Sequence, residues 1–130
     1  MMAKGKTKKA KIVEPKDEPR APGTTTIAPS VLVRIAQLTS LSIPGVAGMA
    51  PVPGGVNRLF RRGGSDGVRI ELDDKSVAVD LYLTLDYGIE VRMVSRKVQR
   101  EVARALEDMV GMRVTRVDIY IEEIEFEHET

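Results

Sequence analysis

A change of period between residues 77 and 111 constrains the fold of this chain more than any other feature. Large apolar residues occupy every odd position of its first part: Val77, Val79, Leu81, Leu83, Leu85 and Tyr87. This period of two predicts a strand with one buried face. After Gly88 the apolar residues recur every three or four positions, at Val91, Val94, Val98, Val102, Ala105, Leu106 and Met109. That spacing predicts an amphipathic helix, and Gly111 stands where a left-handed C-terminal cap is expected.

The neighbouring segments predict the rest of the domain. Residues 24–27 are read as a short edge strand, and Pro29 suits the first turn of a helix. An apolar stripe predicts the buried side of that helix: Val31, Ile35, Leu38 and Ser42, widened by Leu32 and Ala36. Residues 44–67, rich in glycine and proline, are read as a long loop.

Two further strands complete the predicted sheet. Residues 67–72 alternate and join the long strand through a turn at residues 73–75, which predicts a hairpin. Residues 114–121 form the last strand, and its alternation slips at Glu122-Glu123, which predicts a bulge or the end of the strand. The expected fold class is α+β, a two-layer sandwich with two helices packed on one face of a three- to four-stranded mixed sheet.

Charge divides the 130-residue chain into a basic tail and an acidic domain. Residues 1–22 carry seven Lys or Arg against three Asp or Glu, a net charge of +4, and are predicted to be disordered. Residues 23–130 carry thirteen against sixteen, a net charge of −3. We place the folded domain at residues 23–126 and a short acidic tail at residues 127–130. The basic tail serves either to keep the chain in solution or to attract anionic lipid or nucleic acid.

The chemistry of an enzyme is missing from the sequence. There is no cysteine, and the single histidine, His128, lies in the acidic tail. Asp73 and Asp74 suit a turn, and Asp80 is read as part of a solvated strand face. We therefore predict no catalytic residue, no cofactor, no metal site and no enzymatic activity. No apolar run approaches the roughly 20 residues that span a bilayer, so no transmembrane segment is predicted.

Charged and aromatic residues instead suggest surfaces for partners. A row of arginines recurs every fourth residue on the long helix: Arg92, Arg96, Arg100 and Arg104. Arg96 and Arg100 have no acidic residue three or four positions away, so either salt or a partner anion neutralises them. Tyr82 and Tyr120 are expected on the uncovered face of the sheet, among mixed charges that favour protein over nucleic acid.

Two candidate motifs fall within the predicted loop. One is a basic and aromatic group that could contact lipid, nucleic acid or protein: Arg58, Phe60, Arg61 and Arg62. The other is the GxxG at Gly45–Gly48, which is reminiscent of KH-type RNA modules although apolar residues stand between its glycines. The alternative interpretation of this GxxG is a helix stop followed by a buried valine.

Several short motifs together resemble the alkaline-shock, envelope-stress-response family of bacterial proteins. They are Pro44 to Met49, Tyr87-Gly88, Val98-Gln99, Met109 to Gly111 and the strand from Val114 to Ile121, and the resemblance covers about residues 23–126. Asp118 replaces a usual Asn and Val110 a common Thr. The resemblance implies a bacterial, cytoplasmic protein peripheral to the inner face of the membrane. It also implies self-association and a membrane-anchored protein partner, and it supplies no catalytic residues.

These observations favour a non-enzymatic interaction or scaffold protein of the envelope stress response. Two alternatives remain open at this point. One is a KH-like nucleic-acid-binding module, and the other is a regulatory partner of lipid-synthesis enzymes, a setting that the resemblance also implies.

Overall fold

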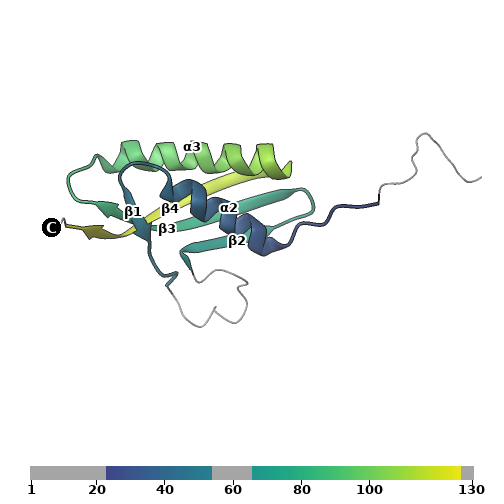
Figure 1. Cartoon of the computed structure of the whole chain (residues 1–130), viewed down its shortest axis with the longest axis horizontal. Coiled ribbons are helices and arrows are strands. Elements are labelled where there is room, and N and C mark those ends of the chain that lie inside the picture. The colour runs from purple at the N-terminus through teal and green to yellow at the C-terminus, as the bar shows by residue number, and fades with distance from the viewer. Residues whose placement is uncertain (1–22, 54–65, 127–130) are drawn as a thin grey trace, which may run out of the picture.

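The computed structural model describes residues 23–53 and 66–126 (Figure 1). In chain order its elements are α2 (Pro29–Leu41), β1 (Val46–Met49), β2 (Val68–Leu72), β3 (Ser76–Asp86), α3 (Val91–Val110) and β4 (Arg113–Glu125). The two helices lie side by side on one face of a four-stranded mixed sheet (Figure 1). The predicted α+β two-layer architecture is confirmed.

The sheet is built around β3. β4 runs parallel to β3 along its whole length, from Ser76 opposite Arg113 to Asp86 opposite Glu125. β2 and β1 are both antiparallel to β3, pairing with residues 77–81 and 83–85 respectively. Because β4 occupies one edge of β3, β2 and β1 must follow each other along the other edge. β3 is therefore the central strand, and it is buried continuously from Val79 to Leu85.

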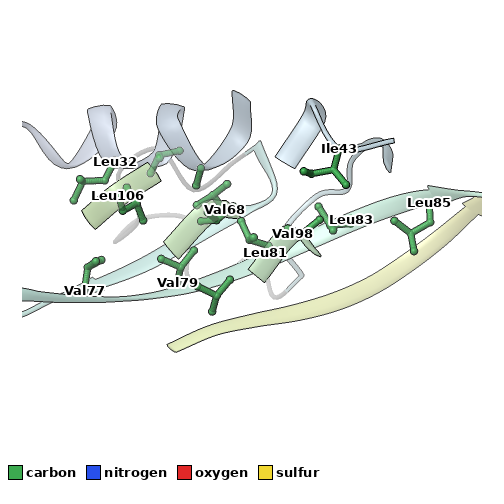
Figure 2. Close-up of a cluster of buried hydrophobic side chains, with 14 residues drawn as sticks. Leu32, Ile43, Val68, Val77, Val79, Leu81, Leu83, Leu85, Val98 and Leu106 are labelled. Carbon is green, nitrogen blue, oxygen red and sulfur yellow. The ribbon is translucent and has the colours of Figure 1, made fainter. Parts of the chain in front are cut away.

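The odd-numbered residues of β3 form the floor of the core beneath the helices (Figure 2). Val77, Val79, Leu81, Leu83 and Leu85 are at most 1% exposed. The helices contribute Leu32, Val33 and Ala36 from α2 and Val98, Val102 and Leu106 from α3. Burying each large aliphatic side chain stabilises the fold by about 1.5–3 kcal/mol. The predicted core-facing side of β3 is thus confirmed from Val77 to Leu85. Tyr87, expected on the same side, lies beyond the end of the strand and is 67% exposed, and the other face of β3 is largely buried as well.

The predicted α3 is confirmed in its centre and in its C-terminal cap. Gly111 has a φ of 80°, in the left-handed region, and its N–H donates to the carbonyl of Glu107 at 3.0 Å. Val91 and Met109, which we expected on the buried stripe, are 39% and 69% exposed. A 20-residue helix is about 30 Å long, and only its central turns lie over the buried core.

The predicted buried side of α2 is right for Leu32 and Ala36, which are buried, and wrong for Val31 and Leu38. The helix buries Leu32, Val33, Ala36, Gln37 and Ser40, whereas the expected Val31 and Leu38 are 44% and 57% exposed.

The cause is that α2 is apolar on two opposite sides, so periodicity alone does not say which side faces the sheet. The small side chains of Ala36 and Ser40, both 0% exposed, allow the helix to approach its neighbours closely.

The long loop predicted at residues 44–67 contains a strand that sequence reasoning missed. β1 is only four residues long, and its register is set by β3, with Val46 opposite Leu85 and Met49 opposite Leu83. So short a segment has no periodicity of its own to detect. The strand expected at residues 24–27 is not formed: that described segment has no regular secondary structure.

Gly67 marks the point where the chain returns to the sheet at β2. Its φ is 81°, and a Cβ atom there would lie 2.7 Å from the carbonyl oxygen of Ala50. Only glycine combines this backbone conformation with such a close approach.

The slip predicted in the last strand is a β-bulge. Leu83 lies opposite Ile121 and Thr84 opposite Glu123, so Glu122 is the extra residue of β4. The bulge returns Ile124 to the helix-facing side of the sheet, opposite Leu85. A second irregularity lies between the pairs made by Val77 and Ala78.

Candidate interaction surfaces

A buried carboxylate organises the sheet face that the helices do not cover. Asp80 is 4% exposed and accepts hydrogen bonds from Arg69 on β2, at 3.0 and 3.2 Å, and from Arg116 on β4, at 2.8 Å. The prediction that Asp80 belongs to a solvated strand face is therefore wrong. The register explains the burial of Asp80. Arg69 lies directly opposite Asp80, and Arg116 lies opposite Ala78, which is two residues before Asp80 on the same face of β3.

Arg116 joins this cluster to the edge of the face. Its guanidinium also donates to Asp118 at 2.9 Å and lies 3.5 Å from Glu71. The hydrogen bond to Asp80 raises the pKa of both arginines above the ordinary value. With two arginines against three carboxylates, the cluster is internally neutralised and offers no cationic site for a phosphate.

The two tyrosines predicted on this face stack on each other. The ring centroids of Tyr82 and Tyr120 are 4.8 Å apart, with an interplanar angle of 15°. Tyr82 is only 6% exposed, whereas Tyr120 is 40% exposed. Burial raises the pKa of the Tyr82 phenol above 10. The outward ring of Tyr120 is therefore the part of this pair that is accessible to a partner.

The arginine row lies on the solvent side of α3. Arg92, Arg96, Arg100 and Arg104 are all exposed, while Val98, Val102 and Leu106 face the core. Arg104 pairs with Glu101 at 3.7 Å. Within the described part of the chain, no ion pair is recorded for Arg92, Arg96 or Arg100. Like charges four residues apart on a helix repel by about 0.2–0.5 kcal/mol per pair, and an anionic partner would relieve that repulsion.

A second aromatic pair, which the sequence did not single out, lies at the end of the sheet where α3 begins. The centroids of Tyr87 and Phe126 are 4.8 Å apart, and the rings are 67% and 65% exposed. The N–H of Tyr87 donates to the carbonyl of Glu125 at 3.0 Å. The rings meet because β3 and β4 pair in parallel up to Asp86 and Glu125. The sequence does not show this contact, because the two residues are far apart in the chain.

Two grooves flank the helices. One of about 350 Å³ is lined by Gln37, Leu41, Met49, Ala50, Pro51 and Asp66. The other, of about 220 Å³, lies at the start of α3 and is lined by Ile43, Pro44, Glu90, Met93, Val94 and Lys97. In the described ranges, no group of three or more His, Cys, Asp or Glu residues could hold a metal ion.

The GxxG does not form the loop of a KH-type module. Residues 46–49 are β1, and Gly48 lies opposite Thr84 of β3. A glycine pair engaged in a sheet cannot wrap a nucleic-acid backbone as a loop does. The extra strand also changes the predicted element order, because three strands rather than two separate the helices.

Other predicted features lie outside the described residues. These are the basic tail at residues 1–22, the acidic end at residues 127–130, and the basic and aromatic group of Arg58, Phe60, Arg61 and Arg62. Neither helix of the described domain is long and apolar enough to cross a membrane.

Solved structures and known sequences were compared with the chain. A MamM-CTD structure superposes with a TM-score of 0.49 and 13% identity, covering 75% of this chain and 100% of that one. Another, the cadmium form of a MamM-CTD variant, has a TM-score of 0.46 and 15% identity, covering 73% of this chain and 95% of that one. Likeness at this level carries no information about function.

Similarity to bacterial sequences is more informative. Uncharacterized protein YqhY of Bacillus subtilis (strain 168) is 28% identical over 107 residues, which cover 81% of this chain and 79% of the relative. Uncharacterized protein Spy1535 of Streptococcus pyogenes serotype M6 is 30% identical over 105 residues, 78% of this chain and 79% of the relative. A family model described by a cell envelope-related function matches residues 17–126. This match spans most of the chain and confirms the resemblance seen in the motifs: the chain belongs to the alkaline shock protein 23 family.

Proposed function

We propose that this chain is a non-enzymatic interaction protein of the cell envelope, held at the cytoplasmic side of the membrane by a membrane-anchored protein and able to self-associate. The cell envelope-related function of its family gives the setting. A scaffold role fits a domain whose charged and aromatic residues lie on outer surfaces.

The observation that carries the proposal is the exposed arginine row of α3. Arg96 and Arg100 lie within a 20-residue helix, are exposed, and have no acidic residue three or four positions away along the helix. We assign these two residues to the recognition of acidic protein groups. A guanidinium binds a carboxylate through two parallel hydrogen bonds, so the row favours a partner that presents Asp or Glu.

The chain itself offers one such acidic surface. Glu122 and Glu123 lie exposed at the bulge of β4, whereas the arginine row lies on α3. Contact between the row of one copy and the bulge of another would therefore join unlike charges. A membrane-anchored partner with a similar acidic segment would compete for the same row.

Nucleic acid is the second candidate, since a row of arginines also suits phosphates. Two observations weigh against it. On the described sheet face, Arg69 and Arg116 are neutralised by Asp80, Asp118 and Glu71. Residues 23–130 also carry a net charge of −3, which repels a polyanion.

The test compares the full chain with its Arg96→Glu/Arg100→Glu variant. A Lys75→Glu/Arg113→Glu variant makes the same change in net charge at exposed positions near the other end of the domain. We expect association with bacterial membrane fractions to be lost in the first variant and kept in the control. The reason is that only the first variant removes the proposed contact.

A single-stranded RNA or DNA titration separates the candidates. The protein interpretation predicts no measurable nucleic-acid affinity near physiological salt. Binding that weakens by roughly 0.7–0.9 log units per neutralised phosphate for each tenfold rise in salt, and that disappears in the α3 variant, would contradict it.

A further inference from the structure

Helix α2 has an apolar stripe that the described part of one chain leaves exposed. The stripe consists of Ile27, just before the helix, and Val31, Ile35, Leu38 and Leu41, and we call it the outer stripe. Ile27, Val31, Leu38 and Leu41 are 37%, 44%, 57% and 45% exposed, and Ile35 is partly buried against the core. At about 100° per residue the stripe is diametrically opposite the buried Leu32, Val33, Ala36 and Ser40. A surface helix usually places charged residues on this side.

The spacing of the stripe is that of a seam between two helices. Val31, Ile35 and Leu38 are separated by four and three residues, which is the heptad spacing of helices that pack at a shallow angle. The seam covers under two heptads, too few to pair isolated helices. It suits a contact between two helices that are already held by folded domains.

The charged residues beside the outer stripe indicate what kind of helix could pack on it. Arg34 is the one charged residue of α2, and it lies on the same flank as Gln37 and Leu41. These two residues line the groove of about 350 Å³ that also contains Asp66. A hydrogen bond joins α2 to the segment just before β2 on this flank: Nε2 of Gln37 donates to the backbone carbonyl of Asp66 at 3.2 Å. One flank of α2 therefore carries a cation, Arg34, beside a groove whose lining includes one acidic residue, Asp66.

We propose that the outer stripe binds the outer stripe of a second copy of this chain, with the two α2 helices antiparallel about a two-fold axis. In such a pair the same flank of each helix meets. Ile35 of one copy then packs near Leu38 of the other, and Arg34 of each copy faces the groove and Asp66 of its partner. The surface is thus complementary to itself in shape and in charge.

A membrane surface is a poorer occupant of the stripe. Helices that lie on anionic membranes have several Lys or Arg residues on their polar side, whereas α2 has only Arg34. The net charge of −3 on residues 23–130 also opposes an anionic lipid surface.

The small buried area of the α2–α2 contact limits the affinity of the dimer. The 13 residues of α2 span about 20 Å, so the pair buries less than the roughly 1,200 Å² typical of stable complexes. We expect a weak dimer, with a Kd of about 10 μM to 1 mM. This inference rests on the self-association in the proposed function and adds a contact through α2 to the one proposed for the arginine row.

Sedimentation equilibrium of the full chain over that concentration range tests the proposal. Leu38→Glu should raise the dimer Kd at least about tenfold, because the mutation places two carboxylates at the seam. Met109→Glu is the matched control, since Met109 is 69% exposed on α3 and lies away from the stripe. Both variants should melt at nearly the wild-type temperature.

A charge exchange tests the geometry. Arg34→Asp and Asp66→Arg should each weaken the dimer, and the double variant should restore it. The chain has no cysteine, so a single Leu38→Cys substitution followed by a short bismaleimide should yield covalent dimers, and Arg100→Cys should not. Failure of the double variant to restore the dimer would overturn the antiparallel arrangement.

Other outcomes separate this inference from the proposed function. A dimer that survives Leu38→Glu but is lost in Arg96→Glu/Arg100→Glu would overturn the role of α2 and keep self-association. A wild-type chain that stays monomeric up to about 1 mM would overturn the α2 pairing, and membrane association through the arginine row would still be tested separately. Vesicle binding that is lost in Leu38→Glu, without any dimer, would identify the stripe as a lipid surface instead.

Discussion

The guanidinium of Arg116 donates a 2.8 Å hydrogen bond to Oδ1 of Asp80, which lies 36 residues earlier in the chain. Arg69 approaches the same carboxylate from the opposite strand and binds Oδ2 at 3.0 Å. Asp80 thus links β2, β3 and β4 on the face that the helices leave uncovered. A side chain that resembles a solvated strand residue in the sequence is a cross-link of the sheet.

The first prediction follows from this cross-link. Asp80→Leu should lower the free energy of unfolding by about 2–4 kcal/mol, because it leaves two arginines without their shared, buried partner. A solvated Asp80, as expected from the sequence, would instead predict almost no effect. Chemical denaturation measures the change, and Asp118→Asn is the control. Asp118 is 47% exposed in its side chain, so that variant should cost no more than about 1 kcal/mol.

The second prediction concerns the helix-facing side of the same strand. Leu81 is 0% exposed at the centre of β3. Leu81→Asp should unfold the domain, since an unpaired buried carboxylate costs several kcal/mol against a total stability of about 5–15 kcal/mol. Circular dichroism would detect the loss of structure. Met109→Asp should leave the spectrum unchanged, and equal effects from both variants would show that the strand faces are assigned wrongly.

The third prediction concerns alkaline pH and Tyr82. Burial raises the pKa of Tyr82 in the folded state above its ordinary value of 10.0. The folded chain then holds this proton more tightly than the unfolded chain does. The stability from the protonated phenol is therefore complete below about pH 10 and is lost as the pH rises through the folded-state pKa.

Two measurements check this. Absorbance titration of phenolate should show one of the three tyrosines ionising later than the others, and Tyr82→Phe should remove that late step. Denaturation at increasing pH should show a loss of stability above pH 10 that is smaller in Tyr82→Phe than in Tyr120→Phe. Identical titration curves for wild type and Tyr82→Phe would contradict the burial of this phenol.

The fourth prediction concerns the basic tail. Residues 1–22 carry a net charge of +4, and residues 23–130 carry −3. We expect the purified full chain to bind vesicles containing anionic lipid weakly, and deletion of residues 1–22 to abolish that binding. Basic residues near an anionic surface contribute about 1 kcal/mol each. Binding that resists added salt, or that survives the deletion, would show that another surface contacts the lipid.

The sequence by itself determined the features that depend on neighbours along the chain. The alternation from Val77 to Leu85 specified β3, because side chains of a strand point alternately to its two faces. Gly111 marked the end of α3, since a left-handed residue is least costly at glycine. The slip in alternation at Glu122-Glu123 indicated a bulge or the end of the strand, because alternation is also a pattern of neighbouring residues. The arginine row was visible because its residues are one helical turn apart.

Only the tertiary structure decided the features that depend on what packs against each element. α2 is apolar on both sides, so its buried side was set by which side met the sheet and α3, and Leu38 was left outside. β1 forms because β3 offers it an edge, although its own four residues lack a pattern. Asp80 is buried because the register of three strands brings Arg69 and Arg116 to it. Contacts between residues far apart in sequence have no local signal, and these contacts determine which surfaces remain exposed for a partner.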